Sequence, residues 1–353
     1  MKKIVSVIIT VFILIFSLLF IILPKKEFSS NENRYLEKFP SINLDNIISS
    51  KAQKSFIEYI SDHFPFREEL LYVNTKRSLY TGINRISNVY YAKDKFLLEE
   101  FKKPKYSDKI IRIINRFINN NNNVNISFML VPTSININNN KLDKINISYD
   151  EDKVINYYKE KLNCNFIDVR DALKNSGEKY LFYKTDHHWT SKGAGISYNT
   201  YKNINREYEY EVVSKEFLGT LYSKVLDNSL DKDVILKVKD NKKYIIDGED
   251  KSLYDDSYLD KKDKYSYFLG GNKGLTIITN KEGVGDILII KDSYANSMIP
   301  FVVMDYMNTH VIDPRYYKKS ITSYIKENNI KEALFVYNVL TLDEDLGILN
   351  INS

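Results

Sequence analysis

The sequence predicts an α/β domain built on a parallel sheet with helices on both faces, preceded by a transmembrane helix and a short helical region. Two observations lead to this fold class. From about residue 86 onward, apolar strand-like runs alternate with helical runs, which favours a parallel sheet covered on both faces. Near the N-terminus, Ile4 to Leu23 is an uncharged apolar run of 20 residues, long enough to cross the hydrocarbon core of a bilayer.

The apolar run is flanked by Met1-Lys2-Lys3 and Pro24-Lys25-Lys26 and lacks the small-residue pattern of a cleavage site. These features favour an uncleaved signal anchor over residues 1–26, with a removed signal peptide as the alternative. The single cysteine, Cys164, agrees with export, because a chain with one cysteine forms no internal disulfide.

Residues 27–85 are expected to form a membrane-proximal helical region. Apolar residues fall near helical spacing between Leu44 and Ile60 and again between Leu70 and Leu79. Pro65 disfavours helix at the residue before it and suits the start of a helix, so Phe64-Pro65-Phe66-Arg67 predicts a corner between two helices. Polar residues at this corner, Asp62, His63 and Arg67, are expected to form a structural ion pair and cap, with a catalytic role as the alternative.

Residues 86–353 contain the predicted α/β elements. Strands are expected at 88–91 and 96–98 as a hairpin around Lys93-Asp94-Lys95, and then at 124–131, 166–169, 285–291, 310–313 and 333–337. Helices are expected at 108–118, 154–162, 191–201, 297–307 and 320–328. In open α/β sheets, functional groups gather beyond the carboxyl ends of the strands.

Residues 205–284 are less regular and are expected to form an insertion over the site, as a lid or flap. Phe217 to Tyr222 predicts a β-insertion, and Leu269-Gly270-Gly271-Asn272 predicts a turn. Five tyrosines of the segment are candidates for stacking on sugar rings, although most of a tyrosine-rich stretch is packed surface. These residues are Tyr222, Tyr254, Tyr258, Tyr265 and Tyr267.

Residues 184–190, Lys-Thr-Asp-His-His-Trp-Thr, contain two of the four histidines and the one tryptophan. Histidine beside a carboxylate is a natural general base near neutral pH. In an extended segment, residues i and i+2 point to the same side, so Asp186 is expected to orient His188 while His187 faces the other way.

The candidate nucleophile is Ser293, which follows the strand predicted at 285–291 at a strand-to-helix turn. A serine becomes nucleophilic when a base removes its proton, and N–H groups of a following helix stabilise an oxyanion. The hypothesis requires His188 to lie roughly 2.6–3.2 Å from Ser293 Oγ. Asp-Ser after a strand is also an ordinary helix cap.

A metal site is a further interpretation of the histidine cluster. Asp186, His187 and His188 are all possible ligands, and Asp-His-His is found in a class of metal-dependent phosphoesterases. Those enzymes need further metal-binding aspartates at strand ends, for which Asp168, Asp292 and Asp313 are candidates. Neighbours on an extended chain diverge, which disfavours a shared ion, and no metal or cofactor is expected. A buried structural histidine is the remaining alternative.

Asp186-His187-His188-Trp189 resembles the motif for which the DHHW protein family is named. Further segments look like signatures of the same family: Glu32-Asn33-Arg34, Asp62 to Arg67, Gly219 to Lys224, Gly270-Gly271-Asn272 and Lys291-Asp292-Ser293-Tyr294. More distantly, the chain resembles alginate O-acetyltransferase proteins with a permuted SGNH-hydrolase-like domain. The resemblance implies such a three-layer fold, an extracytoplasmic setting, and Asp186, His188 and Ser293 as a triad.

The same resemblance implies residues around the triad and partners. It places Asn338, after the second strand beyond the nucleophile, in the oxyanion hole, and Arg315 in the analogous position after the intervening strand; each is equally a candidate turn residue. Tyr294 is a further candidate for oxyanion or substrate binding. The implied partners are a cell-surface polysaccharide, the membrane, and a membrane-bound O-acyltransferase that supplies acyl groups.

The composition narrows the function classes. The formal net charge of +5 is small and charges of both signs are interspersed, whereas a nucleic-acid binder needs a concentrated basic face. The chain contains no Gly-rich phosphate loop of either common type. The predicted function is a membrane-anchored Ser-His-Asp O-acetyltransferase or acetylesterase acting on cell-surface polysaccharide. The alternatives are a non-catalytic polysaccharide-binding or assembly protein and a metal-dependent phosphoesterase.

Overall fold

The computed structural model describes residues 2–142, 146–240, 242–344 and 346–352. The chain divides into two compact units. One contains Met1–Ser87 with Tyr222–Ser229, and the other contains Asn88–Leu221 with Leu230–Ser353. The division predicted from the sequence, into residues 1–26, 27–85 and 86–353 with an insertion at 205–284, stays a prediction.

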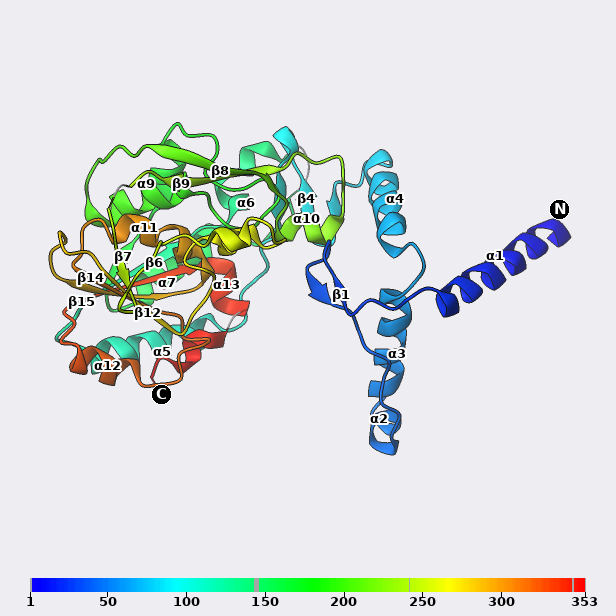
Figure 1. Cartoon of the computed structure of the whole chain (residues 1–353), viewed down its shortest axis with the longest axis horizontal. Helices are drawn as coiled ribbons and strands as arrows, with labels where there is room; N and C mark the ends of the chain where they lie inside the picture. The colour runs from blue at the N-terminus through cyan, green and yellow to red at the C-terminus, as the bar shows by residue number, and fades with distance from the viewer. Residues whose placement is uncertain (1, 143–145, 241, 345, 353) are drawn as a thin grey trace. The chain divides into compact units, whose positions relative to one another are not determined.

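The first unit is mainly helical. Its elements are α1 (Lys2–Ile22), β1 (Phe28–Ser29), β2 (Arg34–Tyr35), α2 (Leu44–Ile48), α3 (Lys51–Asp62), α4 (Arg67–Tyr80) and β3 (Arg85–Ile86), with most of α10 (Thr220–Val225) (Figure 1). Among the described residues, α1 is the one helix long and apolar enough to cross a membrane, over Lys3–Ile22. This N-terminal helix is consistent with a signal anchor or with a signal peptide.

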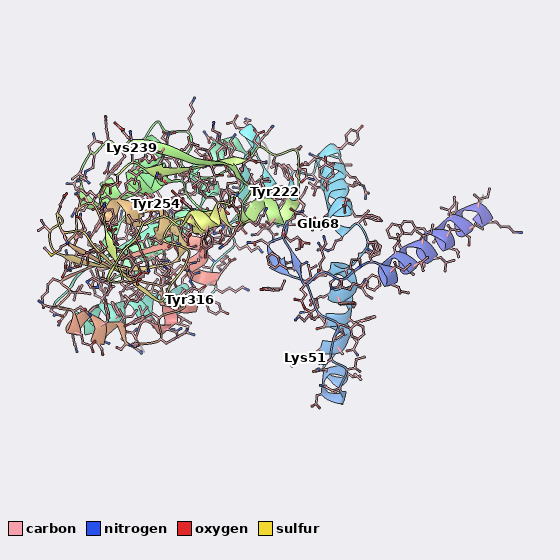
Figure 2. The ribbon with its side chains drawn as sticks, in the orientation of Figure 1. Lys51, Glu68, Tyr222, Lys239, Tyr254 and Tyr316 are labelled. Atoms are coloured by element: carbon pink, nitrogen blue, oxygen red, sulfur yellow. The ribbon has the colours of Figure 1, made fainter. Side chains whose placement is uncertain are left out.

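Charged side chains fix the corner between α3 and α4. The guanidinium of Arg34 donates to both carboxylate oxygens of Asp62, at 2.8 and 2.5 Å. Arg67 pairs with Glu32, and Glu68, in the first turn of α4, accepts a hydrogen bond from Ser29 Oγ at 3.0 Å (Figure 2). The predicted ion pair at this corner is confirmed, with Arg67 Nε 3.9 Å from Asp62 Oδ1, but the closer partners come from the Glu-Asn-Arg segment about thirty residues earlier in the chain. The predicted cap is wrong, because Phe66 is the N-cap of α4 and no side chain caps it.

The second unit contains a mixed sheet between helices. Its strands are β4 (Val89–Tyr91), β5 (Leu97–Glu99), β6 (Asn125–Val131), β7 (Asn165–Ile167), β8 (Tyr210–Phe217), β9 (Asp233–Val238), β10 (Ile245–Ile246), β11 (Glu249–Asp250), β12 (Leu275–Thr279), β13 (Asp286–Lys291), β14 (Asn308–Ile312) and β15 (Glu332–Asn338). Its α-helices are α5 (Ser107–Asn120), α6 (Ser134–Ile137), α7 (Glu151–Lys161), α8 (Arg170–Asn175), α9 (Ser191–Lys202), α11 (Ile299–Val302), α12 (Ile321–Glu327) and α13 (Val339–Glu344).

The main sheet has the order β11-β10-β12-β14-β13-β15-β6-β7. Its five strands from β14 to β7 are parallel, whereas β12, β10 and β11 pair antiparallel at one edge. The predicted α/β class is confirmed, with the correction that the sheet is mixed. The antiparallel strands come from the predicted insertion, so part of that segment extends the sheet rather than covering it.

The central strands are buried on both faces, as expected for strands covered by helices on both sides. In β13, Leu288 and Ile290 pack into one core with α5, α7 and α12, while Ile287 and Ile289 pack into another with α9 and α11. This alternation follows the period of two along a strand. All four side chains are fully buried.

Two local predictions are wrong. The β-insertion expected at 217–222 is instead the end of β8 followed by the helix α10. The helix expected at 297–307 is the short α11, which follows the 3₁₀ helix Ser293–Ser297. Pro300 at the start of α11 has no backbone N–H to donate, and the chain turns toward β14 soon after it.

Candidate active site

Asp186 and His188 form a tight buried pair. Asp186 Oδ1 lies 2.6 Å from His188 Nδ1 and also accepts the backbone N–H of His188 at 3.0 Å. Both side chains are at least nine-tenths buried. Burial acts to raise the pKa of Asp186, but His187, His188 and hydrogen bonds from His188 and Thr220 outweigh it and hold that pKa well below its usual range. The carboxylate therefore stays charged and fixes the orientation of the imidazole.

The loop that contains the pair is held by its own backbone and by Asp233. Thr190 N donates to Leu181 O at 2.8 Å, so the two ends of the loop meet before α9 begins. Asp233, at the start of β9, accepts from the N–H groups of Lys184 and Thr185 at 2.8 and 2.7 Å. A buried carboxylate that accepts several bonds from one loop fixes that loop strongly.

Ser293 follows the carboxyl end of β13, and its Oγ lies 2.9 Å from His188 Nε2, although the two residues are 105 positions apart. The helix cap at this turn is Asp292, whose side chain accepts the N–H of Tyr294 at 2.8 Å. Ser293 is the first residue after the cap, so its hydroxyl remains available to His188. The N–H groups behind it belong to a 3₁₀ turn and not to the predicted α-helix.

Tyr265 and Trp189 connect the histidine loop to the nucleophile turn. The ring of Tyr265 stacks on that of His188, with centroids 3.7 Å apart and an interplanar angle of 9°. The hydroxyl of Tyr265 lies 3.1 Å from Ser293 O, and Trp189 Nε1 donates to Tyr294 O at 2.8 Å. These contacts place Tyr265 and Trp189 where they position His188 against Ser293.

Gly219 and Thr220 fix the second oxygen of Asp186. Thr220 N donates to Asp186 Oδ2 at 2.8 Å. A Cβ at Gly219 would lie 2.2 Å from Asp186 Cβ and 2.3 Å from its Oδ2. No side chain fits in that space, so this close approach requires glycine.

His187 has hydrogen-bond partners other than those of His188. Its Nδ1 lies 2.6 Å from Thr220 Oγ1, and its backbone oxygen accepts the hydroxyl of Tyr294. The expectation that His187 faces the other way is wrong, because its ring centroid lies 3.9 Å from that of His188 and its Nδ1 lies 3.9 Å from Asp186 Oδ1.

A shared metal ion fits this cluster poorly. Ligand atoms of Asp186, His187 and His188 lie within 4.8 Å of one another, but both ring nitrogens of His188 are already engaged, with Asp186 and with Ser293. Asp186 Oδ2 accepts two bonds from Thr220. The proposed additional ligands are also engaged: Asp168 pairs with Arg170, Asp313 pairs with Arg315, and Asp292 accepts backbone N–H groups.

Asn338, Arg315 and Tyr294 were expected at an oxyanion or substrate site. In the structure their side chains have other partners or are buried. Asn338 ends β15, and its Nδ2 donates to Val131 O at 3.1 Å while its Oδ1 accepts Leu340 N at 3.0 Å. The guanidinium of Arg315 donates to Asp313 at 2.8 and 2.6 Å. Tyr294 is buried. Their assignment to the oxyanion or the substrate stays a prediction.

A polar cluster lies beside Ser293. The sequence marked its segments as motifs but assigned no role to its residues. Lys291 Nζ donates to Asn272 Oδ1 at 2.9 Å, and Asn296 Nδ2 donates to the same oxygen at 3.1 Å. In a 3₁₀ helix, residues i and i+3 lie on one face, so Asn296 shares a face with Ser293. Burial lowers the pKa of Lys291 to about 8, while Asp313, 3.5 Å away, favours its charge.

Sequence reasoning missed the roles of Tyr265, Gly219, Asn272 and Asp233. Gly219 and Asn272 fall in segments that resemble family signatures. That resemblance is the one sequence feature that points to a role for these two residues. Tyr265 was grouped with tyrosines that stack on sugars; it is instead buried, as are Tyr222 and Tyr267. For Asp233 no sequence signal was found, because its partners lie about fifty residues away.

Comparison with known proteins supports the fold. A family model described as DHHW protein matches residues 84–312. A DHHW family protein from Eubacterium siraeum is similar over 76% of this chain and 97% of that chain, with 23% identity and a TM-score of 0.65. PatB1 from Bacillus cereus, solved with a sulfonyl adduct, is similar over 75% and 98%, with 22% identity and a TM-score of 0.60. A search of curated proteins gives no match.

Proposed function

This chain belongs to the DHHW protein family, and we propose that it is a membrane-anchored, extracytoplasmic O-acetyltransferase or acetylesterase of the Ser-His-Asp type. The observation that supports this most strongly is the line of contacts from Asp186 through His188 to Ser293, at 2.6 and 2.9 Å. A helix cap or a structural histidine does not require residues 105 positions apart to meet in this order.

The proposed reaction has two halves. Ser293 Oγ attacks the carbonyl of an acyl donor while His188 Nε2 takes the hydroxyl proton, and Asp186 stabilises the imidazolium. The tetrahedral intermediate then collapses, the donor alcohol leaves with the proton from His188, and an acyl-serine remains. In the second half, His188 deprotonates an acceptor hydroxyl, which attacks the acyl-serine and releases Ser293. Water as the acceptor gives an esterase, and a sugar hydroxyl gives a transferase.

We assign stabilisation of the oxyanion to the Nδ2 amide of Asn272. Its Oδ1 is held by Lys291 and Asn296, so the opposite end of the amide presents its N–H groups in a fixed direction. The side chain is only half-buried, and Asn296 lies one 3₁₀ turn beyond Ser293 on the same face. Preorganised donors at such a position are among the largest contributors to acyl-transfer catalysis.

The substrate and the acyl source follow from the setting. Outside the cell no soluble activated acyl donor is expected, so a membrane-bound O-acyltransferase is proposed to supply acyl groups. The acceptor is proposed to be a cell-surface polysaccharide, in line with the resemblance of the sequence to alginate O-acetyltransferase proteins. A non-catalytic polysaccharide-binding protein is the alternative of a different class.

The test is Ser293→Ala, measured with a chromogenic acetyl ester and with a sulfonyl fluoride followed by mass spectrometry of the labelled peptide. We expect the wild type to turn over the ester and to be labelled on Ser293. The variant should lose both properties with an unchanged circular dichroism spectrum, and a chelator should have no effect. Activity that survives Ser293→Ala but not chelation would assign a metal-dependent reaction. No turnover or labelling of the wild type would favour the binding protein.

A further inference from the structure

Helix α4 exposes an apolar stripe. Leu70 and Val73 are 45% and 59% exposed, and their spacing of three residues places them on one face of the helix. Phe66, the N-cap residue just before the helix, is 53% exposed. Thr75, on another face of the same helix, is buried and donates to Val225 O at 3.0 Å. The helix therefore uses a different face for its hydrogen bond within the unit, and about half of each apolar side chain of the stripe stays exposed.

Helix α3 adds apolar side chains of the same kind. Ile57 and Ile60 are 67% and 37% exposed and lie three residues apart. Lys54, whose side chain is 80% exposed, flanks Ile57 one turn earlier. An apolar pair bordered by a long cationic side chain is typical of a helix that lies in a membrane interface, with the lysine reaching the headgroups.

The corner between these helices contacts the predicted membrane-spanning helix. The ring of Phe64 stacks on that of Phe16 in α1, with centroids 5.4 Å apart, and the ring of Phe66 lies 6.5 Å from Phe16. Phe16 lies six residues before Ile22, the last residue of α1, which corresponds to about 9 Å along the helix. If Ile22 lies at the outer, headgroup edge of the bilayer, Phe16 and the corner that contacts it lie about 9 Å below that edge, which is the depth of the boundary between headgroups and acyl chains.

The backbone at the corner turns an aromatic ring outward. Phe66 has φ 57° and ψ 31°, a left-handed conformation that bulky residues rarely adopt. The conformation is held by the ion pairs of Arg34 with Asp62 and of Arg67 with Glu32. In addition, α3, which begins at Lys51, and α4 run across the direction of α1 (Figures 1 and 2). Helices across a membrane-spanning helix run along the membrane surface.

We infer that the face formed by Ile57, Ile60, Phe66, Leu70 and Val73, called the membrane-surface face below, lies in the interfacial layer of the phospholipid bilayer that α1 crosses. The inference rests on the proposed membrane anchor. The face is continuous with α1 through Phe64 and Phe66. A bilayer that surrounds α1 therefore also contacts the face, and this identifies lipid as its occupant. Aromatic side chains such as Phe66 suit the boundary between acyl chains and headgroups.

The test measures bromine quenching of tryptophan fluorescence in the full chain reconstituted into phosphatidylcholine vesicles. The one native tryptophan, Trp189, is fully buried, so its constant signal is subtracted with the wild type. The variants Phe66→Trp and Val73→Trp place probes on the membrane-surface face. Tyr72→Trp, on another face of α4, is the matched control, and Leu14→Trp in α1 reports insertion of the anchor. We expect lipids brominated near the headgroup end of the acyl chain to quench the first two at least twofold more than Tyr72→Trp.

The outcomes separate this inference from the anchor on which it rests. Quenching of Leu14→Trp without quenching of Phe66→Trp or Val73→Trp would leave the anchor in place and overturn the membrane-surface face. Absence of quenching at Leu14→Trp would overturn the anchor and the face together. Leu70→Cys, in a Cys164→Ser background, tests whether a second copy of this chain covers the face. Disulfide-linked dimers under oxidation, together with no quenching at Phe66→Trp, would assign the face to self-association and overturn the lipid assignment. The esterase measurement with Ser293→Ala is independent of all these readouts.

Discussion

The pairs Asp62–His63 and Asp186–His188 each combine an aspartate with a neighbouring histidine, and the two pairs have different partners. At the end of α3, Asp62 accepts two hydrogen bonds from Arg34, at 2.8 and 2.5 Å, and His63 Nε2 lies 3.0 Å from Glu37 O. In the loop before α9, Asp186 Oδ1 lies 2.6 Å from His188 Nδ1. The first carboxylate is neutralised by a guanidinium, whereas the second is directed at an imidazole.

The difference shows what makes a histidine a base. A carbonyl oxygen only accepts hydrogen bonds. His63 Nε2 must therefore carry a hydrogen and donate a hydrogen bond to Glu37 O. His188 is held by Asp186 at Nδ1, so its Nε2 faces Ser293 Oγ as an acceptor. Arginine is always charged and binds a carboxylate in a fixed fork, which suits the first pair to holding a corner. The second pair suits proton transfer.

The strongest test of this comparison replaces each histidine in turn. His188→Ala is expected to lower kcat/KM for the chromogenic ester by about 10⁴-fold, because members of a triad act as a unit. His63→Ala is expected to leave kcat/KM within about twofold, because its imidazole contacts the backbone of Glu37 and belongs to no catalytic triad. Equal losses in both variants, measured on chains with unchanged circular dichroism spectra, would remove the distinction.

A second test asks whether the second pair needs the amide of Asn272. Asn272→Asp keeps an oxygen for Lys291 but removes the N–H groups, so we expect kcat to fall by about 10²–10³-fold with KM little changed. Asn272→Ala should show a similar loss. The thermal midpoint of each variant is the control for folding. A full rate in Asn272→Asp would show that the oxyanion is stabilised elsewhere, with Asn338 and Arg315 as the next candidates.

A third test disturbs Asp186 without changing the triad. In Gly219→Ala the added Cβ must displace Asp186, which it would meet at 2.2 Å, and a displacement of about 1 Å at a catalytic group costs about 100-fold in rate. The matched control is Gly177→Ala, because Gly177 has no heavy atom within 4 Å of its ideal Cβ. That control is expected to affect stability but not the rate of ester hydrolysis. Comparable rates in the two variants would contradict the role assigned to Gly219.

The smallest effect is expected at the first pair. Asp62→Asn should lower the free energy of local opening of α3 and α4 by about 1–2 kcal/mol at pH 7, a modest value because Arg34 is partly exposed and screened by solvent. Hydrogen exchange of the α3 and α4 amides is the measurement, and ester hydrolysis should not change.

The same variant has a defined pH dependence. The hydrogen bond from Arg34 holds the pKa of Asp62 below its usual range, so the stabilisation is fully present above the pKa of the unfolded chain, about 3.9, and is lost as the pH falls through the lower pKa of the folded state. The difference between wild type and Asp62→Asn should therefore shrink below about pH 4. A difference that is constant down to strong acid would show that the ion pair does not fix the corner.

The sequence by itself determined the local features of this protein. An uncharged run of sufficient length predicted α1, apolar runs predicted the strands β6, β13 and β15, and the spacing of Asp186 and His188 placed their side chains on one side of an extended loop. These features depend on residues a few positions apart, whose geometry is set by the periods of helix and strand. The length of α11 was not predictable in this way, because the 3₁₀ turn before it is held by contacts with Tyr265 and Asn272.

Only the tertiary structure decided which distant residues meet. The strand order places β13 between β14 and β15, and Asp233, Trp189 and Tyr265 bring the histidine loop to the turn after β13. Gly219 contacts Asp186 across 33 positions of the chain, and Asn272 contacts Asn296 across 24. Contacts of this kind have no period in the sequence, because they arise from how packed elements align and from buried polar groups that must find partners.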